Sequence, residues 1–363
     1  MLFLCNNNTH LLVLLDFISH KENDDLIHVF ISFKSDNLLN QDFIDQLLVN
    51  DYVTIDIQSL HIHKNKRRNI RNKLLLIKKN YKKQSYDNVF FFTDTDIQNR
   101  LIIKLIRTKL SILIEEGIGL YQKDSLFSLK SLIRSTLFFL KTGFMFYLHP
   151  MEQGNRGLHD ILICRYPKQL PKHKRFKHET VQFDSMYSNL VLDFFAKKSI
   201  KKSNIKIDAI FFGTPISETG FLKRTEELDL LRRTIKKFNK EGFSVYIKPH
   251  PREDFSKYNE FSDLLIHDFK QMIAEVLIRI IKPQYAISFS SSVLLNLSNT
   301  KNIYLYDCTK SDLPNKSFLK SLATDEKKYH PKSIDQIDLI PIKNNKIVTP
   351  RYLVSEIHNI VND

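Results

Sequence analysis

Residues 2–17 read LFLCNNNTHLLVLLDF, and this stretch indicates the fold class. The apolar residues 2–5 predict a buried strand, and the asparagine-rich residues 6–9 predict a loop. Asn8 and Thr9 are favourable N-cap residues for a helix over the apolar run that follows. A strand, a polar loop and a helix in this order form the repeating unit of an α/β fold.

The same unit recurs in both halves of the chain. In the first half the predicted strands are residues 28–33, 52–55, 89–92 and 110–114, and the predicted helices are residues 41–49 and 97–108. A Lys- and Ser-rich stretch near residues 197–206 is interpreted as a linker. After it, the predicted strands are residues 209–212, 244–248, 285–289 and 303–306, and the predicted helices are residues 221–238, 293–297 and 352–360. This alternation predicts an α/β protein with parallel sheets and two Rossmann-like domains, residues 1–200 and 201–363, that face a cleft.

The composition fits a soluble, two-domain protein. A chain of 363 residues is too long for one ordinary domain and predicts two. Its content of 42% apolar and 26% charged residues is typical of globular proteins. Cys5, Cys164 and Cys308 are far apart and show no metal-ligand spacing, which indicates reduced thiols. The first residues lack the basic segment and cleavage site of a signal peptide. We therefore expect a cytoplasmic protein.

The most apolar long stretch is residues 126–148, which carries Lys130, Arg134 and Lys141. Three charges within about one membrane thickness argue against a transmembrane helix. A helix here could lie in the interface of the inner membrane, where the basic clusters would add peripheral contact. A buried core helix of the first domain explains the same apolar pattern, and we prefer that interpretation.

The net charge of +15 predicts an anionic partner. Residues 64–83 contain ten Lys and Arg side chains and no acid. From this run we select Arg67, Arg68, Arg71 and Lys73 as a candidate acceptor-binding patch. The partner could be a nucleotide donor, an acidic polysaccharide, a phospholipid surface or nucleic acid, and the alternative is a solvated basic face.

A polyanion-binding protein with no enzymatic activity is a rival class of function. Tyr81 lies within the basic run and Tyr86 just after it, as in nucleic-acid-binding patches. The sequence contains no recognisable nucleic-acid-binding module, so we do not expect nucleic acid as a partner. Such a protein would also have no need for the three polar clusters that follow predicted strands.

The first cluster is residues 115–119, Glu-Glu-Gly-Ile-Gly, directly after the predicted strand 110–114. Adjacent carboxylates raise the pKa of each other, so Glu115 or Glu116 could serve as a general base. Glycines next to them let the backbone turn tightly and approach a ligand. The alternative is a charged turn between two elements.

The second cluster is Lys248-Pro249-His250-Pro251-Arg252, after the strand 244–248. The flanking prolines restrict the backbone and hold the histidine in one direction. A histidine beside two cations suits protonation or stabilisation of a departing phosphate. A lone histidine is more often structural, but its place at a strand end favours function.

The third cluster is residues 288–292, Ser-Phe-Ser-Ser-Ser, between the strand 285–289 and the predicted helix 293–297. Backbone N–H groups at a helix N-terminus, joined by hydroxyls, can bind an anion without a glycine-rich loop. Simple N-capping, which needs only one serine, is the alternative.

These motifs resemble those of bacterial sialyltransferases and capsule polysialyltransferases. Residues 114–119 resemble the family's acidic D/E-D/E-G motif, residues 247–251 its HP motif and residues 290–292 its serine motif. Residues 211–218, Phe-Phe-Gly-Thr-Pro-Ile-Ser-Glu, resemble the strand and loop that open its nucleotide-binding domain. The motif order matches, and the resemblance extends from the loop at residues 6–9 to Asp307.

The resemblance implies a GT-B fold and an inverting, metal-independent sialyltransferase with no cofactor, whose donor is CMP-sialic acid. The acceptor would be an anionic or galactose-terminated bacterial glycan of lipooligosaccharide or capsule, and a polysialyltransferase or another nucleotide-sugar transferase is the alternative. Carried onto this chain, the catalytic residues would be Glu115 or Glu116 as base, with Glu218 in reserve, and His250 at the leaving phosphate. The donor-binding residues would be Gly213, Thr214, Lys248, Pro251, Ser290, Ser291 and Ser292.

A metal-dependent transferase is the remaining rival, because Asp94-Thr95-Asp96 follows the predicted strand 89–92. Paired aspartates after a strand can hold a divalent ion and a nucleotide diphosphate. We prefer the simpler interpretation, in which Thr95 or Asp96 caps the helix 97–108, and we therefore predict no metal.

Overall fold

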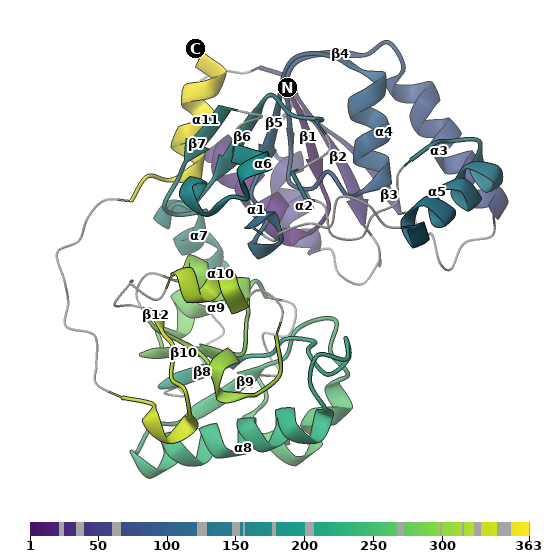
Figure 1. Cartoon of the computed structure of the whole chain (residues 1–363). Coiled ribbons are helices and arrows are strands. Elements are labelled where there is room, and N and C mark those ends of the chain that lie inside the picture. The colour runs from purple at the N-terminus through teal and green to yellow at the C-terminus, as the bar shows by residue number, and fades with distance from the viewer. Residues whose placement is uncertain are drawn as a thin grey trace. The chain divides into compact units, whose positions relative to one another are not determined.

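The computed structural model describes residues 1–21, 25–33, 40–59, 67–121, 129–146, 153–154, 157–175, 179–199, 207–266, 272–297, 300–313, 316–322, 328–339 and 350–362. The chain divides into two compact units (Figure 1). The first is Met1–Val191 with Pro350–Asp363, and the second is Leu192–Thr349.

The first unit is built on a seven-stranded parallel sheet with the order β3-β2-β1-β4-β5-β6-β7. Its strands are β1 (Leu2–Cys5), β2 (Ile27–Phe33), β3 (Val53–Ser59), β4 (Ser85–Phe91), β5 (Arg107–Ile114), β6 (Ile161–Cys164) and β7 (Glu179–Gln182). The strand order reverses between β1 and β4, so the loops that follow these strands diverge there. Such a switch point is where parallel α/β sheets bind ligands.

Helices connect the strands of the first unit. They are α1 (Asn8–Ser19), α2 (Gln41–Leu48), α3 (Arg67–Tyr81), α4 (Ile97–Leu105), α5 (Leu129–Thr142), α6 (Lys172–Arg175), α7 (Asn189–Ser199), which crosses the unit boundary, and α11 (Leu353–Asn362). The cap of α1 is Asn7, one residue before the predicted Asn8 and Thr9, and it accepts the backbone N–H of His10.

The second unit is built on a five-stranded parallel sheet with the order β12-β11-β10-β8-β9. Its strands are β8 (Ala209–Phe212), β9 (Val245–Lys248), β10 (Tyr285–Ser288), β11 (Lys301–Tyr304) and β12 (Lys328–Tyr329). Its helices are α8 (Arg224–Lys240), α9 (Ala274–Ile281) and α10 (Lys316–Ser321). The order reverses between β8 and β10, which places a second switch point there.

Both cores form because short apolar strands are covered by helices. β1, β8 and β10 are buried along their whole length, as expected for parallel strands with two covered faces. In the first unit the ring of Phe3 stacks on Phe90 at 4.6 Å. In the second, Phe238 meets Tyr285 edge to face at 5.4 Å. The predicted α/β class with parallel sheets is confirmed.

The closing helix packs with the first unit. The ring of His358 on α11 stacks on Phe17 of α1 at 4.6 Å, and Arg351 pairs with Asp184. The division therefore differs from the expected domains 1–200 and 201–363, because residues 350–363 leave the second half and return to the first sheet.

Two helices differ from their predicted form. The predicted helix 293–297 is a 3-10 helix, Ser292–Asn296, too short to carry a substantial dipole. The apolar helix near residues 126–148 is α5, and all four of its leucines are exposed, so our preference for a buried core helix was wrong. Within the described ranges, no helix has the length and apolar character to cross a bilayer.

Candidate functional site

Three of the predicted loops follow neighbouring strands of the second sheet. β9, β8 and β10 are adjacent and parallel, so their carboxyl ends lie at one edge. Gly213 follows β8, Pro249 and His250 follow β9, and Phe289 follows β10. The backbone N–H of Gly213 donates to the carbonyl of Lys248 at 3.0 Å, which holds the first two loops together. This edge includes the switch point, so its position is suited to binding a ligand.

Thr214 carries a buried hydroxyl at this edge. Its side chain is 7% exposed, and Oγ1 has no hydrogen-bond partner among the described residues. Burying a hydroxyl without a partner costs on the order of 1–3 kcal/mol. A ligand that accepts or donates a hydrogen bond at Oγ1 would remove that cost, which is consistent with the predicted donor-binding role of Thr214.

His250 is held as a neutral imidazole. Its Nδ1 accepts the backbone N–H of Arg252 at 3.1 Å, so the ring proton is on Nε2. Burial, together with the charges of Arg252 and Lys248, lowers the pKa of His250 to about 4. The side chain is therefore a hydrogen-bond donor at neutral pH. An anion that offset the two cations would raise its proton affinity.

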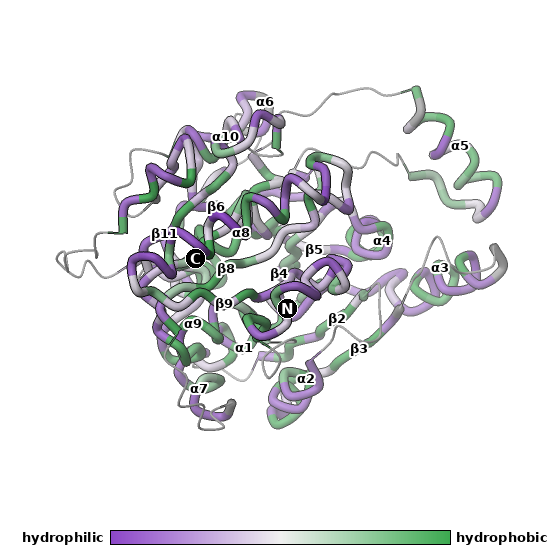
Figure 2. The backbone as a smooth tube through the Cα atoms, turned by 90° about the horizontal axis from the view of Figure 1, so that it is seen from below, coloured by the Kyte–Doolittle hydropathy of each residue, from purple (hydrophilic) through white to green (hydrophobic). Residues whose placement is uncertain are grey.

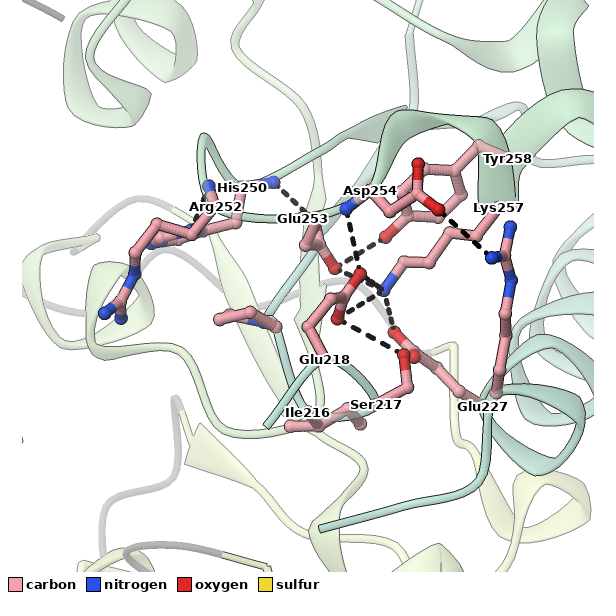
Figure 3. A network of polar contacts seen from close by, with 12 residues as sticks. Ile216, Ser217, Glu218, Glu227, His250, Arg252, Glu253, Asp254, Lys257 and Tyr258 are labelled. Carbon is pink, nitrogen blue, oxygen red and sulfur yellow. Dashed lines mark hydrogen bonds and ion pairs between the residues drawn. The ribbon is translucent and has the colours of Figure 1, made fainter. Parts of the chain in front are cut away.

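The loop of His250 is anchored by Glu253, which lies one residue beyond the motif 248–252. The backbone N–H of His250 donates to Glu253 Oε2 at 2.5 Å, and the hydroxyl of Tyr258 donates to Oε1 at 2.9 Å (Figure 3). Burial raises the pKa of Glu253, and Lys257, at 2.8 Å from Oε1, acts in the opposite direction. Glu253 thus fixes the direction of the HP loop.

Lys257 joins three carboxylates below that loop (Figure 3). Its Nζ lies 2.6 Å from Glu227, 2.8 Å from Glu253 and 3.2 Å from Glu218. Burial alone would lower the pKa of Lys257, but the neighbouring carboxylates outweigh it and the pKa is raised. A buried cation with several anionic partners is the arrangement in which burial is tolerated.

Glu218, the reserve candidate for the base, is part of this network. It accepts the backbone N–H of Asp254 at 3.0 Å and contacts Lys257. Burial alone would raise the pKa of Glu218, but these hydrogen bonds lower it. A carboxylate stabilised in its ionised form is a weaker proton acceptor, so the structure favours an anchoring role for Glu218.

Gly213 is required by the same network. A Cβ at this position would lie 2.1 Å from Glu253 Oε2 and 2.8 Å from the Tyr258 hydroxyl oxygen. Three donors hold Glu253 in place, so it has little freedom to move away.

Gly213→Ala is expected to lower the free energy of unfolding by about 1–3 kcal/mol, because it overpacks the site. Urea denaturation would measure the loss. Glu253→Asp shortens the side chain by one methylene, so it should cost less stability in the Gly213→Ala background than in the wild type. Additive effects of the two substitutions would contradict the steric explanation.

The serine cluster is a turn in place of the predicted helix N-terminus. Ser291 caps the 3-10 helix by accepting the N–H of Val293 at 3.3 Å, and its own N–H donates to Ser288 Oγ at 3.2 Å. Ser290 and Ser291 are buried and Ser292 is partly exposed. The helix-dipole basis for an anion site is therefore weak, and hydroxyls remain as the candidate ligands.

Lys248 and Pro251 complete the predicted donor residues. Lys248 is buried at the end of β9, and desolvation lowers its pKa to about 8 against the opposing effect of Glu275. A lysine with that pKa still carries its charge at neutral pH and can attract a phosphate. Pro251 is exposed beyond His250.

In the first unit, Glu115 is in a buried ion pair. It is fully buried, and Arg165 reaches its Oε1 with Nε at 2.7 Å and Nη2 at 2.5 Å. The backbone N–H of Arg165 and the hydroxyl of Tyr121 donate to Oε2. Burial alone would lower the pKa of Arg165, but Glu115 outweighs it and the pKa is raised. These contacts indicate a structural role for Glu115.

Glu116, the next residue, is about one third exposed, with a side chain 35% accessible. Its Oε1 accepts a hydrogen bond from Asn7 Nδ2 at 2.9 Å and lies 3.4 Å from Nε2 of His10. Asn7 follows β1 and Glu116 follows β5, so the pair lies at the carboxyl edge of the first sheet, next to its switch point.

His10 was missed in the sequence because it lies within an apolar run. Its ring is fully buried, stacks on Phe92 at 4.0 Å, and accepts the backbone N–H of Asn6 at Nδ1. Nε2 therefore carries the proton, and it lies 3.2 Å from Asn7 Nδ2 and 3.4 Å from Glu116 Oε1. A residue oriented in this way by a histidine and an amide is the better candidate for a base than Glu115.

Asp94 and Asp96 have structural contacts. Asp96 caps α4 by accepting the N–H groups of Gln98 and Asn99. This confirms Asp96 as the cap, out of the predicted pair Thr95 and Asp96. Asp94 Oδ2 accepts the N–H of Gly154 at 3.0 Å. In the part of the chain that the structure describes, no group of three or more His, Cys, Asp or Glu side chains is arranged to hold a metal.

The predicted basic patch falls on α3. Arg71 is exposed and Lys73 partly exposed on this helix. Arg67 and Arg68 begin the helix, and their side chains lie outside the described part of the structure. The helix itself was not predicted, although Ile70, Leu74, Ile77 and Tyr81 bury one face at helical spacing.

Comparison with known proteins agrees with the family resemblance of the motifs. The family model "Alpha-2,8-polysialyltransferase (POLYST)" matches residues 1–310. A search among curated protein sequences gave no match.

Solved structures with a similar fold include a Photobacterium damselae sialyltransferase described as its GT-B domain, at 15% identity and a TM-score of 0.48, with 91% of this chain and 100% of that chain covered. A complex of Staphylococcus aureus MnaA with UDP has 11% identity and a TM-score of 0.46 over 84% of this chain and 78% of that chain. Acinetobacter baumannii MurG has 11% identity and a TM-score of 0.40 over 93% of this chain and 86% of that chain. Because these TM-scores are below 0.5, the assignment to a family rests on the family match alone. That match confirms the resemblance inferred from the motifs, and the chain belongs to the alpha-2,8-polysialyltransferase family and is a glycosyltransferase.

Proposed function

We propose that this protein transfers sialic acid from CMP-sialic acid to a glycan, with inversion at the anomeric carbon and without a metal ion. Membership of the polysialyltransferase family supports the sialyl group as the one transferred. The observation that carries the donor side is the edge of the second sheet, where Thr214 presents a buried hydroxyl without a described partner beside the His250 loop.

On the donor side, Nε2–H of His250 would donate to the phosphate oxygen that leaves with CMP. The bond between the anomeric carbon and that oxygen breaks, and negative charge develops on the phosphate. A fixed donor with two nearby cations stabilises such charge. Lys248 would attract the phosphate, with Ser290, Ser291 and Ser292 as further ligands, and Gly213 and Thr214 would line the cytidine side.

On the acceptor side, Glu116 would take the proton of the attacking hydroxyl as the new glycosidic bond forms. An oxocarbenium-like transition state needs a carboxylate near the attacking oxygen and a donor at the leaving group. His10 and Asn7 hold the Glu116 carboxylate in one direction, which favours proton transfer over a mobile side chain.

The acceptor would be a bacterial surface glycan of lipooligosaccharide or capsule type, anionic or galactose-terminated. A polysialyltransferase that extends an anionic chain is a second candidate. It is favoured by the family match and by the exposed cations of α3, which include Arg71, Lys78 and Lys79. Binding of a polyanion by such a surface would weaken with salt.

A donor screen with the purified protein tests the proposal. CMP-Neu5Ac is compared with CMP-Kdo and with UDP- and GDP-sugars, all in the presence of EDTA. We expect turnover with CMP-Neu5Ac alone and no effect of EDTA. Turnover of a different donor, or loss of activity with EDTA, would overturn the donor or the metal-independent mechanism. An oligosialic acid acceptor that grows by several residues would favour the polymerase over a single transfer.

A further inference from the structure

Helix α5 has its polar and apolar faces reversed relative to a core helix. Ser131, Ser135 and Thr142 are buried, together with Phe138, while the leucines point outward. The inward hydroxyls of Ser135 and Thr142 donate to backbone carbonyls one turn earlier, Ser131 at 2.6 Å and Phe138 at 2.8 Å, so the buried face is polar but satisfied. Burial in the first unit therefore does not explain the exposed apolar residues of α5.

The outward residues form one continuous stripe. Leu129, Ile133, Leu137 and Leu140 recur at intervals of three and four residues, which places them on one helix face. Leu129 is 65% exposed and Leu140 is 74% exposed, and Met145 just beyond the helix is 80% exposed. A contiguous apolar surface of this kind marks a binding site for a partner or a membrane. Figure 2 shows the apolar positions along α5.

The charges around the stripe are all positive. Residues 125–151 contain no Asp or Glu. Arg134 and Lys141 are exposed, and helical geometry places both along one edge of the stripe. Helix α3, which packs against α5, adds exposed Leu75 and Leu76.

We propose that the α5 surface, defined as Leu129, Ile133, Leu137, Leu140 and Met145 with Arg134 and Lys141, binds the surface of a bilayer that contains anionic phospholipid. The apolar stripe would enter the acyl boundary and the cations would contact headgroup phosphates. With 14 residues, α5 is too short to cross a bilayer, so it lies along the surface. The basic edge and the net charge of +15 favour an anionic lipid over a second copy of this cationic chain. The proposal holds whichever donor the enzyme uses.

The chain contains no tryptophan, so a single introduced Trp reports on one position. Leu140→Trp is compared with Leu26→Trp, a control residue in the same unit that is also 74% exposed. With vesicles of phosphatidylglycerol and phosphatidylcholine in equal parts, we expect a blue shift for Leu140→Trp and quenching by brominated acyl chains. Pure phosphatidylcholine should give a weaker response. Absence of a shift at Leu140, or an equal shift at Leu26, would overturn the proposal.

Vesicle sedimentation tests the two components of the surface. The triple variant Leu129→Gln, Ile133→Gln, Leu140→Gln should bind at least tenfold more weakly to the anionic vesicles. The matched triple variant Leu26→Gln, Leu48→Gln, Val49→Gln, which also replaces exposed side chains, should bind as wild type. Arg134→Gln with Lys141→Gln should weaken binding about ten- to thirtyfold at low salt, since each cation contributes on the order of 1 kcal/mol.

Circular dichroism and analytical ultracentrifugation complete the test. The replaced side chains are exposed, so the variants should keep the wild-type spectrum. If the α5 triple variant converts a dimer to a monomer while vesicle binding is unchanged, the surface is a self-association interface and the membrane proposal is wrong.

Discussion

His250→Ala is expected to lower the rate of sialyl transfer by about two to three orders of magnitude, the range observed when a positioned hydrogen-bond donor to a developing anion is lost. The backbone N–H of Arg252 donates to Nδ1 of the imidazole, and the backbone N–H of His250 donates to Glu253. Alanine removes the Nε2–H donor together with the Nδ1 acceptor of the Arg252 N–H, whereas the backbone contact to Glu253 stays in place. The rate is measured as CMP release from CMP-Neu5Ac at saturating donor.

The pH dependence of the rate distinguishes a neutral hydrogen-bond donor at His250 from a protonated acid. Because its pKa is lowered to about 4, the free enzyme should show no inflection in kcat/KM near pH 6.5 that depends on His250. The lowered pKa of His250 also makes the free energy of unfolding depend on pH. The unfolded state binds a proton near pH 6.5 and the folded state only near pH 4, so stability falls as pH decreases through that window. His250→Ala should lack this component.

His20→Ala, which alters a partly exposed histidine after α1, serves as the control and should leave transfer unchanged. Near-wild-type turnover of His250→Ala would remove the histidine from the mechanism. A clear inflection near pH 6.5 that disappears with His250 would show that it works as a protonated acid.

The parallel strands could be predicted where burial is complete. β8 was predicted with its observed bounds, Ala209–Phe212, because every residue in it is apolar and buried. β4 begins at Ser85, four residues before the predicted start at Val89, because its first half alternates between exposed and partly exposed positions. Hydrophobicity marks only the covered part of such a strand.

Pairings over long sequence separations could not be predicted. An amphipathic pattern shows that α11 buries one face but does not show which sheet it covers, so the return of residues 350–363 to the first unit was missed. His10 lies in an apolar run, and its partner Glu116 follows a strand far along the chain. The same holds for Lys257, whose carboxylates come from three separate segments. The motifs located the loops, but the contacts that orient each side chain depend on the tertiary structure.

The adjacent carboxylates Glu115 and Glu116 should respond to substitution in opposite ways. Glu115→Gln is expected to lower the free energy of unfolding by about 3–5 kcal/mol, because it leaves the buried guanidinium of Arg165 without its counter-charge. Glu116→Gln is expected to change stability by less than about 1 kcal/mol, since the side chain is partly exposed. Urea denaturation measures both.

Glu116→Gln, which changes stability little, should have the large effect on turnover. Glu116→Gln keeps the size of the side chain and one acceptor oxygen for Asn7 but removes its ability to take a proton, so turnover should fall by about two to four orders of magnitude. Asp87→Asn, a change at an exposed carboxylate of the same unit, should leave both turnover and stability close to wild type. Turnover is compared at a temperature where each variant is folded.

The comparison is decisive because the two residues share a loop but differ in their contacts. Glu115 already accepts hydrogen bonds from Arg165 and Tyr121, so a proton transfer there would have to break a buried ion pair during each turnover. Glu116 is about one third exposed, and Asn7 and His10 orient its carboxylate, so an acceptor hydroxyl can approach it. Full activity of Glu116→Gln, together with a stable but inactive Glu115→Gln protein, would reverse the assignment and make the buried pair the catalytic one.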